Sequence, residues 1–487
     1  MRKIFVRPGI FVLFFGLFFQ SCKKEIISTE QTEDLFLKNE SAIAVYQVHT
    51  AIRKLDQVKN SSYNYEIALW VSPGADSTKS LRLGTDLVVN YELVAGNKTT
   101  TQTFKLKRGS YVTRNFVTLK GPVAITGIAT FPTSYNGRPI TFNNTIIEKS
   151  YDLQPLQIVG KNFMDVNGKI FTPWGANYTG TNELRLVDDN WTDPANWEII
   201  QQDIREMKGL GINVIRIHLQ YNRLMMDAVT PNQQYLSRLG DLLSFAGIYG
   251  MYVDITGLGA YVKEEQPAWY DAMDEQARWA TQAIFWNAVA SVAKNHHNIF
   301  CYNLMNEPVT PSSNTTIWLP GNGFGGFYYV QYITRTPNGR TWDVVTRSWI
   351  DSLKNAIRSE DTRTPVTVGF LGLGVVTIFN DQLEYNSPHV YPDGNNLQAA
   401  YDFVANNQSD HPLVIEETSW FNSSYDETED FINYTQSQQQ TAGYLSHYLG
   451  ETIDQLYENG DLTSVLRAGW FELFYLKLNP NINKPIY

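Results

Sequence analysis

The chain has 487 residues, of which 13% are aromatic and 18% are charged, and its formal net charge is −10. The length exceeds that of a typical single domain and accommodates two, and the composition is that of a globular protein with ample apolar material for a large core. An acidic chain lacks the cationic face that nucleic acid or anionic lipid would need, so we expect neither as its main partner.

The N-terminal residues have the pattern of an export signal. Three basic residues within 2–7 precede an apolar run over 10–19, which is too short to span a bilayer as a finished helix and ends in "FFQSC". The segment resembles a bacterial lipoprotein signal, and the resemblance implies removal of residues 1–21 and lipidation of Cys22. We expect an exported protein that its lipid holds to a membrane, at the outer membrane, the cell surface or the periplasmic face. Plain secretion is the alternative.

The next segment, residues 22–40, is polar and acidic, which is typical of a tether between a lipid and a folded domain. The chain contains two cysteines. If Cys22 carries the lipid, Cys301 has no intramolecular partner, so burial rather than a disulfide must hold the core together. We expect Cys301 to be a small apolar core residue.

Residues 41–155 have the alternating pattern of short β-strands. Polar and apolar residues alternate in "SYNYEIALW", "DLVVNYELV", "TFKLKR" and "PVAITGIATF", and turn residues separate these runs. Short strands and turns at intervals of about 8–12 residues indicate an all-β sandwich. The segment contains no catalytic pattern, so we expect it either to bind glycan or to act as a spacer or brace for the domain that follows.

From residue 156 to residue 487, strand-like runs alternate with helix-like segments. The clearest helix start is Asp193, a capping residue followed by Pro194 at the first helical position. We also expect helices at 236–245, 277–294 and 342–358, and a long helix ending near Gly460. The expected strands are 170–174, 213–219, 251–257, 299–308, 365–371, 385–392, 412–420 and 465–473. Such alternation indicates an α/β fold with a parallel sheet, and eight units favour a closed (β/α)8 TIM barrel over a doubly wound sheet.

Two of these strands end in carboxylates. Asn306 and Glu307 end the fourth strand before a proline, and Glu416 and Glu417 follow four apolar residues of the seventh. In such a barrel the site lies at the C-terminal ends of the strands, and the fourth and seventh strands face each other across the mouth. Since side chains alternate along a strand, only one of Glu416 and Glu417 can face the mouth. Two carboxyl groups about 5 Å apart suit retaining glycoside hydrolysis.

From about residue 156 to the C-terminus, the chain resembles glycoside hydrolase family 5, the cellulase-like barrels. The likeness rests on "NVIRIHL", "NEP", "HVY" and "PLVIEETSW". It implies that Glu307 is the acid/base and Glu417 the nucleophile, with Glu416 where the family has a glycine. The histidine that usually ends the third strand is Thr256 here. The resemblance also implies substrate contacts from other strand ends, namely Arg216, Asn306, His389, Tyr391 and, if the register of "AGWFEL" places it there, Trp470.

The segment 309–340, directly after the fourth strand, carries many aromatic residues among glycines. A long loop at this point would wall the substrate cleft and stack on sugar rings. Alternatively, it would bury its own aromatic side chains to hold itself together. Both interpretations remain open from the sequence.

The sequence therefore predicts an exported, lipid-anchored enzyme that hydrolyses β-glycosidic bonds of a glucan-type polysaccharide or oligosaccharide with retention of configuration. The nearest alternative is the same mechanism on mannan or a glycoconjugate. A non-catalytic surface glycan-binding lipoprotein is the alternative from another class, but a binder would not need both Glu307 and Glu417. We expect no metal and no cofactor, because the histidines show no HExxH or similar spacing and the two-carboxylate mechanism needs none.

Overall fold

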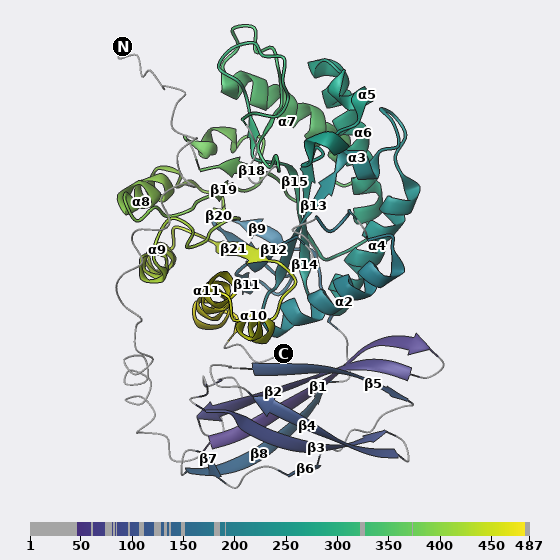
Figure 1. Cartoon of the computed structure of the whole chain (residues 1–487), viewed down its shortest axis with the longest axis vertical. Helices are drawn as coiled ribbons and strands as arrows, with labels where there is room; N and C mark the ends of the chain where they lie inside the picture. Colours follow the sequence, from purple (N-terminus) through teal and green to yellow (C-terminus); the bar gives the residue numbers. More distant parts are fainter. Residues whose placement is uncertain are drawn as a thin grey trace.

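The computed structural model has a barrel of strands and helices next to a separate β region (Figure 1). The predicted signal over 1–21, the lipidation site Cys22 and the tether over 22–40 lie outside the residues that it describes. No helix in the described part is long and apolar enough to cross a bilayer. The described residues are 46–59, 62–73, 80, 83, 85–95, 98–106, 112–120, 128–130, 134–135, 138–147, 151–179, 186–189, 191–321, 327–372 and 374–482.

The N-terminal region consists of two β-sheets that pack face to face. Its strands are β1 (Tyr46–Lys59), β2 (Ser62–Pro73), β3 (Leu87–Ala95), β4 (Lys98–Leu106), β5 (Val112–Lys120), β6 (Ile128–Thr130), β7 (Ser134–Tyr135) and β8 (Arg138–Ile147). One sheet has the order β5-β2-β1-β8-β7 and the other the order β4-β3-β6. Ile67 and Leu69 of β2 share a core with Leu87 and Val89 of β3, because alternate side chains of each strand face the opposite sheet. The predicted all-β sandwich is confirmed.

Eight parallel strands in the described part of the chain form the nearly closed barrel. They are β12 (Trp174–Tyr178), β13 (Val214–Gln220), β14 (Tyr252–Leu258), β15 (Ile299–Asn306), β18 (Val366–Leu371), β19 (Ser387–His389), β20 (Val414–Ile415) and β21 (Gly443–Tyr448). Their order is β19-β18-β15-β14-β13-β12-β21-β20. Two isolated bridges, Asn386 to Leu413 and His389 to Glu417, join the edge strands. The predicted (β/α)8 barrel is confirmed.

Helices cover the outside of the barrel (Figure 1). They are α2 (Pro194–Gly209), α3 (Tyr221–Leu224), α4 (Gln233–Ile248), α5 (Ala268–Asp271), α6 (Glu275–Ala293), α7 (Trp342–Arg358), α8 (Leu397–Asn406), α9 (Tyr425–Ser437), α10 (Ile453–Asn459) and α11 (Leu462–Phe471). Helix α2 begins as predicted, because the Asp193 carboxylate accepts hydrogen bonds from the backbone N–H groups of Ala195 and Asn196 at 2.8 and 3.2 Å. Helix α7 has the predicted bounds.

Two of the predicted strands are misplaced. The first barrel strand is β12, whereas Ile170–Phe171 is β11, which pairs with β10 (Asn162–Met164) and through it with β9 (Gln157–Val159). The eighth strand is β21, and the segment 465–473 expected in its place is helical, in α11 and the turn that follows. The segment that was expected to be one long helix ending near Gly460 contains α9, β21 and α10 instead.

The cause of the second error is that tertiary pairing, not local pattern, makes β21 a strand. It pairs with β20 on one side and with β12, far away in the sequence, on the other. The local signals for the helices were nevertheless present. Gly460 ends α10 with a φ of 69°, and the Asp461 carboxylate caps α11 by accepting from the backbone N–H of Ser464 at 3.0 Å.

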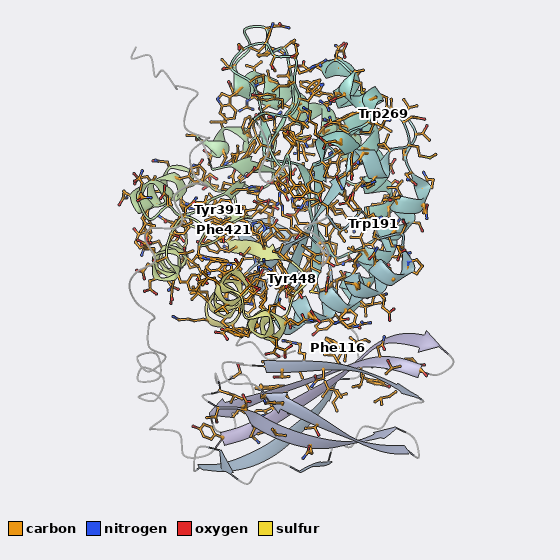
Figure 2. The ribbon with its side chains drawn as sticks, viewed as in Figure 1. Phe116, Trp191, Trp269, Tyr391, Phe421 and Tyr448 are labelled. Carbon is orange, nitrogen blue, oxygen red and sulfur yellow. The ribbon has the colours of Figure 1, made fainter. Side chains whose placement is uncertain are left out.

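The sandwich contacts the barrel through aromatic and charged side chains. Tyr151 lies between the Arg53 guanidinium and the Lys208 ammonium, 4.0 and 4.2 Å from its ring centroid. Its hydroxyl donates to the Glu66 carboxylate at 2.9 Å. Phe116, labelled in Figure 2 at the junction, packs edge-on against Tyr249 with ring centroids 5.0 Å apart.

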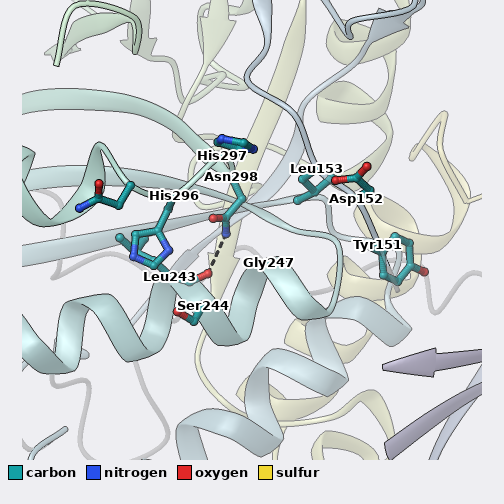
Figure 3. A pocket seen from close by; sticks show the side chains of 10 residues that line it. Tyr151, Asp152, Leu153, Leu243, Ser244, Gly247, His296, His297 and Asn298 are labelled. Atoms are coloured by element: carbon teal, nitrogen blue, oxygen red, sulfur yellow. Dashed lines mark hydrogen bonds between the residues drawn. The ribbon is translucent and has the colours of Figure 1, made fainter. Parts of the chain in front are cut away.

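An open pocket of about 260 Å³ lies beside this junction (Figure 3). Tyr151, His296 and Asn298 are among its lining residues, and the Asn298 amide donates to the Leu243 carbonyl at 2.9 Å. Asn298 directly precedes β15, whereas Glu307 directly follows it, so the pocket and the predicted acids lie at opposite ends of one strand. Asp152 is the only carboxylate among the pocket's described lining residues, so the paired-acid chemistry is not located there.

Candidate active site

The C-terminal ends of the barrel strands bring most of the predicted site residues together. Arg216 lies on β13, Asn306 and Glu307 at the end of β15, His389 at the end of β19, and Glu417 just after β20. Hydrogen bonds and ion pairs link these side chains and Tyr391 into one cluster. Residues separated by as many as 201 positions in the sequence thus share one site.

Glu307 ends its strand in a strained backbone conformation. Its φ is 45°, in the left-handed region that costs non-glycine residues about 1–3 kcal/mol. The Glu307 backbone N–H donates to the Gly369 carbonyl of β18 at 2.8 Å, which holds this conformation. One carboxylate oxygen of Glu307 lies 2.8 Å from His389 Nδ1, and the residue is 8% exposed. The bend before Pro308 therefore turns the Glu307 side chain into the cluster, where it is largely buried.

Glu417 is surrounded by hydrogen-bond donors. Its Oε1 accepts from Arg216 Nη1 at 2.8 Å, and its Oε2 accepts from the Tyr391 hydroxyl at 2.7 Å. His389 Nδ1 is 3.4 Å from the same Oε2. Burial alone would raise the pKa of Glu417, but His389 and Arg216 outweigh burial and hold this pKa well below its usual range. Glu417 is therefore an ionised carboxylate at neutral pH.

The two acids lie at a short separation. One oxygen of Glu307, one oxygen of Glu417 and a ring nitrogen of His389 are all within 4.8 Å of one another. Carboxyl groups about 5–5.5 Å apart are typical of retaining glycosidases, whereas inverting enzymes separate them by about 6.5–9.5 Å to admit a water. The spacing suits direct attack by one carboxylate while the other protonates the leaving group.

Arg216 connects the strands beneath the two acids. Besides Glu417, Nη1 donates to Asn177 Oδ1 at 2.7 Å, and Nη2 donates to Asn306 Oδ1 at 3.0 Å. The Arg216 side chain is fully buried. A Cβ atom at Gly369 would lie 2.8 Å from Arg216 Nη2 and 2.9 Å from His389 Nε2. Only glycine leaves room for both groups at this point of β18.

Three further residues of the cluster were not predicted as site residues. His218 Nε2 lies 3.1 Å from Asn306 Oδ1, and burial, together with the Arg216 charge, lowers the pKa of His218 to about 3. His447 Nε2 lies 3.1 Å from the Tyr391 hydroxyl oxygen, and burial lowers the pKa of His447 too. Asn177 is the third. The alternation of side chains along "NVIRIHL" is a signal for His218, which lies two residues after Arg216 and on the same face. His447 had no such signal, because it belongs to β21, which was not predicted as a strand.

Trp470 does not lie at a strand end. It is on α11, is 1% exposed, and its indole N–H donates to Ser446 Oγ at 2.9 Å. Its ring packs against Trp420 and Phe474, with centroids 5.4 and 5.3 Å away. The prediction that Trp470 contacts substrate is therefore corrected. Trp470 is a core residue that contacts β21 through Ser446. His447, from β21 itself, lies in the cluster instead.

An exposed aromatic ring lies beside the cluster. Phe421 is 54% exposed, and Figure 2 labels it next to Tyr391. The Phe421 ring is nearly parallel to Tyr391 (18°, centroids 6.1 Å apart) and to His447 (26°, 6.3 Å). An aromatic face held in this way offers an apolar surface to one side of a sugar ring.

The described part of the loop 309–340 both buries aromatics and contacts the site. Trp318 is 3% exposed, and the Arg278 guanidinium lies 3.8 Å from its ring centroid. Phe327 stacks on Tyr261, with centroids 5.0 Å apart. The Tyr329 carbonyl accepts a hydrogen bond from Asn306 Nδ2 at 3.1 Å, so the loop orients a site residue through its backbone. Residues 322–326 lie outside the described part.

Two groups of side chains in the described part place possible metal-ligating atoms within 4.8 Å of one another. One is Glu307, His389 and Glu417, and the other is Asp254, Cys301 and Glu416 beneath them. The Arg216 guanidinium contacts a carboxylate of each group. A fixed positive charge at this distance opposes a divalent cation, so the donor set suits protons and hydrogen bonds better than a metal.

Comparisons with known proteins show which family the chain is similar to. The family model described as cellulase (glycosyl hydrolase family 5) matches residues 164–446, more than half of the chain. No curated protein matches the sequence. Similar solved structures include an exo-β-1,4-mannosidase from Opitutaceae bacterium strain TAV5 (14% identity, 66% of this chain and 61% of that chain, TM-score 0.48). They also include a β-mannanase from the blue mussel Mytilus edulis (15% identity, 69% of this chain and 99% of that chain, TM-score 0.48). The chain thus covers less than two thirds of the length of the exo-mannosidase.

Proposed function

The chain belongs to the cellulase family, glycosyl hydrolase family 5, and is therefore a glycoside hydrolase; from this membership we propose that Glu307 is its acid/base and Glu417 its nucleophile. The observation that carries the proposal is the pair of carboxylates with oxygens within 4.8 Å of one another and different surroundings. Glu417 accepts hydrogen bonds from Arg216 and Tyr391, and His389 Nδ1 lies 3.4 Å from its Oε2. Such surroundings suit an anionic nucleophile.

In the first step, a Glu417 oxygen attacks the anomeric carbon while the Glu307 carboxyl group transfers its proton to the glycosidic oxygen. The bond between that oxygen and the anomeric carbon breaks, and the leaving sugar departs as an alcohol. In the second step, the Glu307 carboxylate removes a proton from water as the water oxygen attacks the anomeric carbon and Glu417 leaves. Two inversions at one carbon produce net retention of configuration.

We assign the neighbouring residues to positioning and substrate contact. Tyr391 donates to Glu417 and lies within hydrogen-bonding distance of His447, so neutral His447 can donate through its Nε2–H to the Tyr391 oxygen. These two hydrogen bonds would orient the nucleophilic oxygen. They would weaken as Glu417 loses its negative charge in forming the bond to the anomeric carbon. We assign to Asn306 a contact with a sugar hydroxyl, supported by its position next to Glu307 and by the Arg216 and His218 side chains that orient its Oδ1.

The proposed substrate is a β-linked glucan-type polysaccharide or oligosaccharide. The cellulase description of the matching family supports this class. Mannan and glycoconjugates are the competing substrates for the same mechanism. Glycan binding without catalysis is disfavoured, because the strained Glu307 backbone and the ionised Glu417 are features that binding alone does not require.

The test is a screen of the soluble chain, beginning after Cys22, against β-glucans, β-mannans and β-linked glycoconjugates. We expect cleavage of a β-glucan, with products whose initial anomeric configuration, followed by NMR, is that of the substrate. Cleavage of mannan alone would replace the substrate assignment and leave the mechanism. Inverted products would overturn the roles of Glu307 and Glu417, and binding without cleavage would overturn the function.

A further inference from the structure

Three carboxylates surround the single guanidinium of Arg216. Its Nη1 donates to Glu417 at 2.8 Å, while its Nε lies 3.5 Å from Glu416 and 3.7 Å from Asp254. Asp254, Glu416 and Arg216 are all 0% exposed. One positive charge does not balance three negative charges, and two neighbouring carboxylates in a buried site do not both remain ionised.

The hydrogen bonds around the two buried acids show where a proton is needed. Glu416 Oε1 accepts from the Tyr385 hydroxyl, and Glu416 Oε2 accepts from Asn303 Nδ2, both at 2.7 Å. Asp254 Oδ1 accepts from the Thr256 hydroxyl at 2.9 Å. Among the described residues, no N–H or O–H group donates to the buried Asp254 Oδ2. One carboxylate oxygen of Asp254 and one of Glu416 lie within 4.8 Å of each other, and a hydrogen bond between two carboxyl groups would require a proton on one of them.

We propose that Asp254 and Glu416 share one proton, carried by Glu416 and donated to Asp254, and that neutral Glu416 acts as a positioning residue. The Arg216 guanidinium then interacts with two carboxylates, Asp254 on one side and Glu417 on the other. The inference rests on the proposed function, because the positive charge of Arg216 affects catalysis only if Glu417, which it stabilises, is the nucleophile. Burial, reinforced by the Asp254 charge, raises the pKa of Glu416 well above its usual range.

The remaining titratable groups that face this pair agree with the assignment. Cys301 Sγ lies 3.0 Å from the Tyr385 hydroxyl, and burial raises the pKa of both groups well above the usual range, so both are neutral. Arg216 stands between the pair and Glu417, the other charged group.

A metal ion is the competing occupant, because Asp254, Cys301 and Glu416 have ligand atoms within 4.8 Å of one another. The oxygens of Glu416 already accept from Tyr385 and Asn303. A divalent cation would displace these donors and lie beside Arg216. We therefore assign a proton, and the metal content of the purified chain is one outcome of the test.

The test is infrared spectroscopy of the soluble chain carrying Glu307→Gln, which removes the acid/base carboxyl group from the spectrum. We expect the carbonyl band of a buried protonated carboxylic acid at neutral pH, and its loss when Glu416→Gln is added. Glu66→Gln is the matched control, because Glu66 is equally buried but lies 3.0 Å from Arg114; this variant should lose a carboxylate band. Loss of a carboxylate band in the Glu416→Gln variant would overturn the proposal, as would a stoichiometric metal ion.

If the doubly substituted chain does not fold, isotope labelling replaces it. In the Glu307→Gln chain, one acid band should shift with ¹³C-labelled glutamate, whereas any band that shifts with labelled aspartate belongs to another acid such as Asp188, whose pKa burial and the Asp189 charge raise to about 7. The absence of an acid band that shifts with labelled glutamate would contradict the assignment to Glu416.

Kinetics test the positioning role separately. Glu416→Gln alone should change kcat by less than about threefold and leave the acid limb of the kcat/KM profile in place, because the amide still donates to Asp254. An acid limb that moves to lower pH would mean that an ionised Glu416 had competed for Arg216. If the unsubstituted chain cleaves no β-glycoside, the proposed function fails, but the infrared result still decides where the proton is.

Discussion

At the scale of single residues, Glu307 and Glu417 are the same amino acid with different neighbours. Arg216, Tyr391 and His389 stabilise the negative charge of Glu417. Among the described side chains, His389 is the hydrogen-bond partner of the Glu307 carboxyl group, and the Glu307 backbone is held in the left-handed region. The different surroundings suit the roles that we propose, with Glu417 as the attacking group and Glu307 as the proton donor.

The two roles are separable with an aryl glycoside whose leaving group needs no protonation. In Glu307→Gln the nucleophile remains, so a burst of released phenol should precede slow turnover. In Glu417→Gln the attacking oxygen is absent, so no burst should appear. In Glu307→Gln, the rate of cleavage should fall about 10²–10⁴-fold more for a substrate with a natural, poor leaving group than for the activated aryl glycoside, because general acid catalysis is worth about that much. Stopped-flow absorbance at the phenol wavelength measures both.

Glu416→Gln is the control for this experiment. The Glu416 side chain is 0% exposed and bonds to Tyr385 and Asn303 beneath the site, so its burst should be preserved. A burst that disappears in Glu416→Gln and persists in Glu417→Gln would contradict the assignment of the nucleophile.

Tyr391→Phe tests the pH dependence of the nucleophile. The pKa of Glu417 lies below its usual range, so the active, ionised form persists above that low value and is lost as the pH falls through it. Removing the 2.7 Å hydrogen bond from Tyr391 should move the acid limb of kcat/KM to higher pH. The shift should be at most about 1–2 units, since a hydrogen bond to a charged group is worth about 1.5–3 kcal/mol and one pKa unit is about 1.36 kcal/mol. Tyr434→Phe, at an exposed tyrosine, is the control. If the acid limb of kcat/KM does not move in Tyr391→Phe, Tyr391 does not stabilise the negative charge of Glu417.

At the scale of elements, the strand ends hold the acids and the loops that follow them shape the surroundings. The loop after β20 carries Phe421, with its ring nearly parallel to Tyr391 and His447. The loop after β15 supplies the Tyr329 carbonyl to Asn306. We therefore expect the strands to position the reacting groups and the loops to determine which other contacts the substrate makes.

Phe421→Ala should weaken binding of long substrates more than short ones. Stacking between an aromatic ring and a second ring is worth about 0.5–1.5 kcal/mol beyond area burial, so kcat/KM for an oligosaccharide should fall up to about tenfold. An aryl monoglycoside should be nearly unaffected. Tyr434→Ala, which removes another exposed aromatic (49% exposed) from helix α9, is the matched control. Equal losses on both substrates would show that Phe421 supports the fold rather than the sugar.

At the scale of the whole molecule, the junction between the sandwich and the barrel lies at the opposite end of β15 from Glu307. Tyr151 is central to this junction through Arg53, Lys208 and Glu66. From this arrangement we propose that the sandwich acts on barrel stability rather than on chemistry.

Tyr151→Ala should lower the thermal midpoint and leave kcat on a small substrate unchanged. The lost hydrogen bond to charged Glu66 is worth about 1.5–3 kcal/mol, which corresponds to several degrees. Differential scanning calorimetry and initial rates measure the two effects. A variant that keeps its midpoint but loses turnover would show that the sandwich contributes to the site.

The lipid anchor remains a proposal at this scale, motivated by the basic N-terminal residues, the short apolar run and "QSC". Cys22→Ser should move the protein from the membrane fraction to the soluble fraction without changing its turnover, because the barrel's acids are distant in sequence. Fractionation of the host cells followed by activity assays checks both. A Cys22→Ser protein that still sediments with membranes would contradict lipidation at this residue.

The sequence by itself determined the features that depend on neighbours along the chain. The Asp193 cap, the bounds of α7 and the alternation of the sandwich strands are local signals, and the structure agrees with them. The placement of Glu307 and Glu417 at strand ends also follows from short apolar runs that stop at polar residues. These features are predictable because hydrogen bonds within a turn, a cap or a strand involve residues a few positions apart.

Only the tertiary structure decided the features that depend on residues far apart in the chain. β21 became a strand because β20 and β12 offer it backbone partners on both sides, although its own six residues carry a weak pattern. That pairing placed His447 beside Tyr391 and left Trp470 in the core. Closure of the barrel likewise gathered Asp254, Glu416 and Glu417 around Arg216. The reason is physical: the charge state of a buried acid depends on every group within a few ångströms, and most of these groups come from other strands.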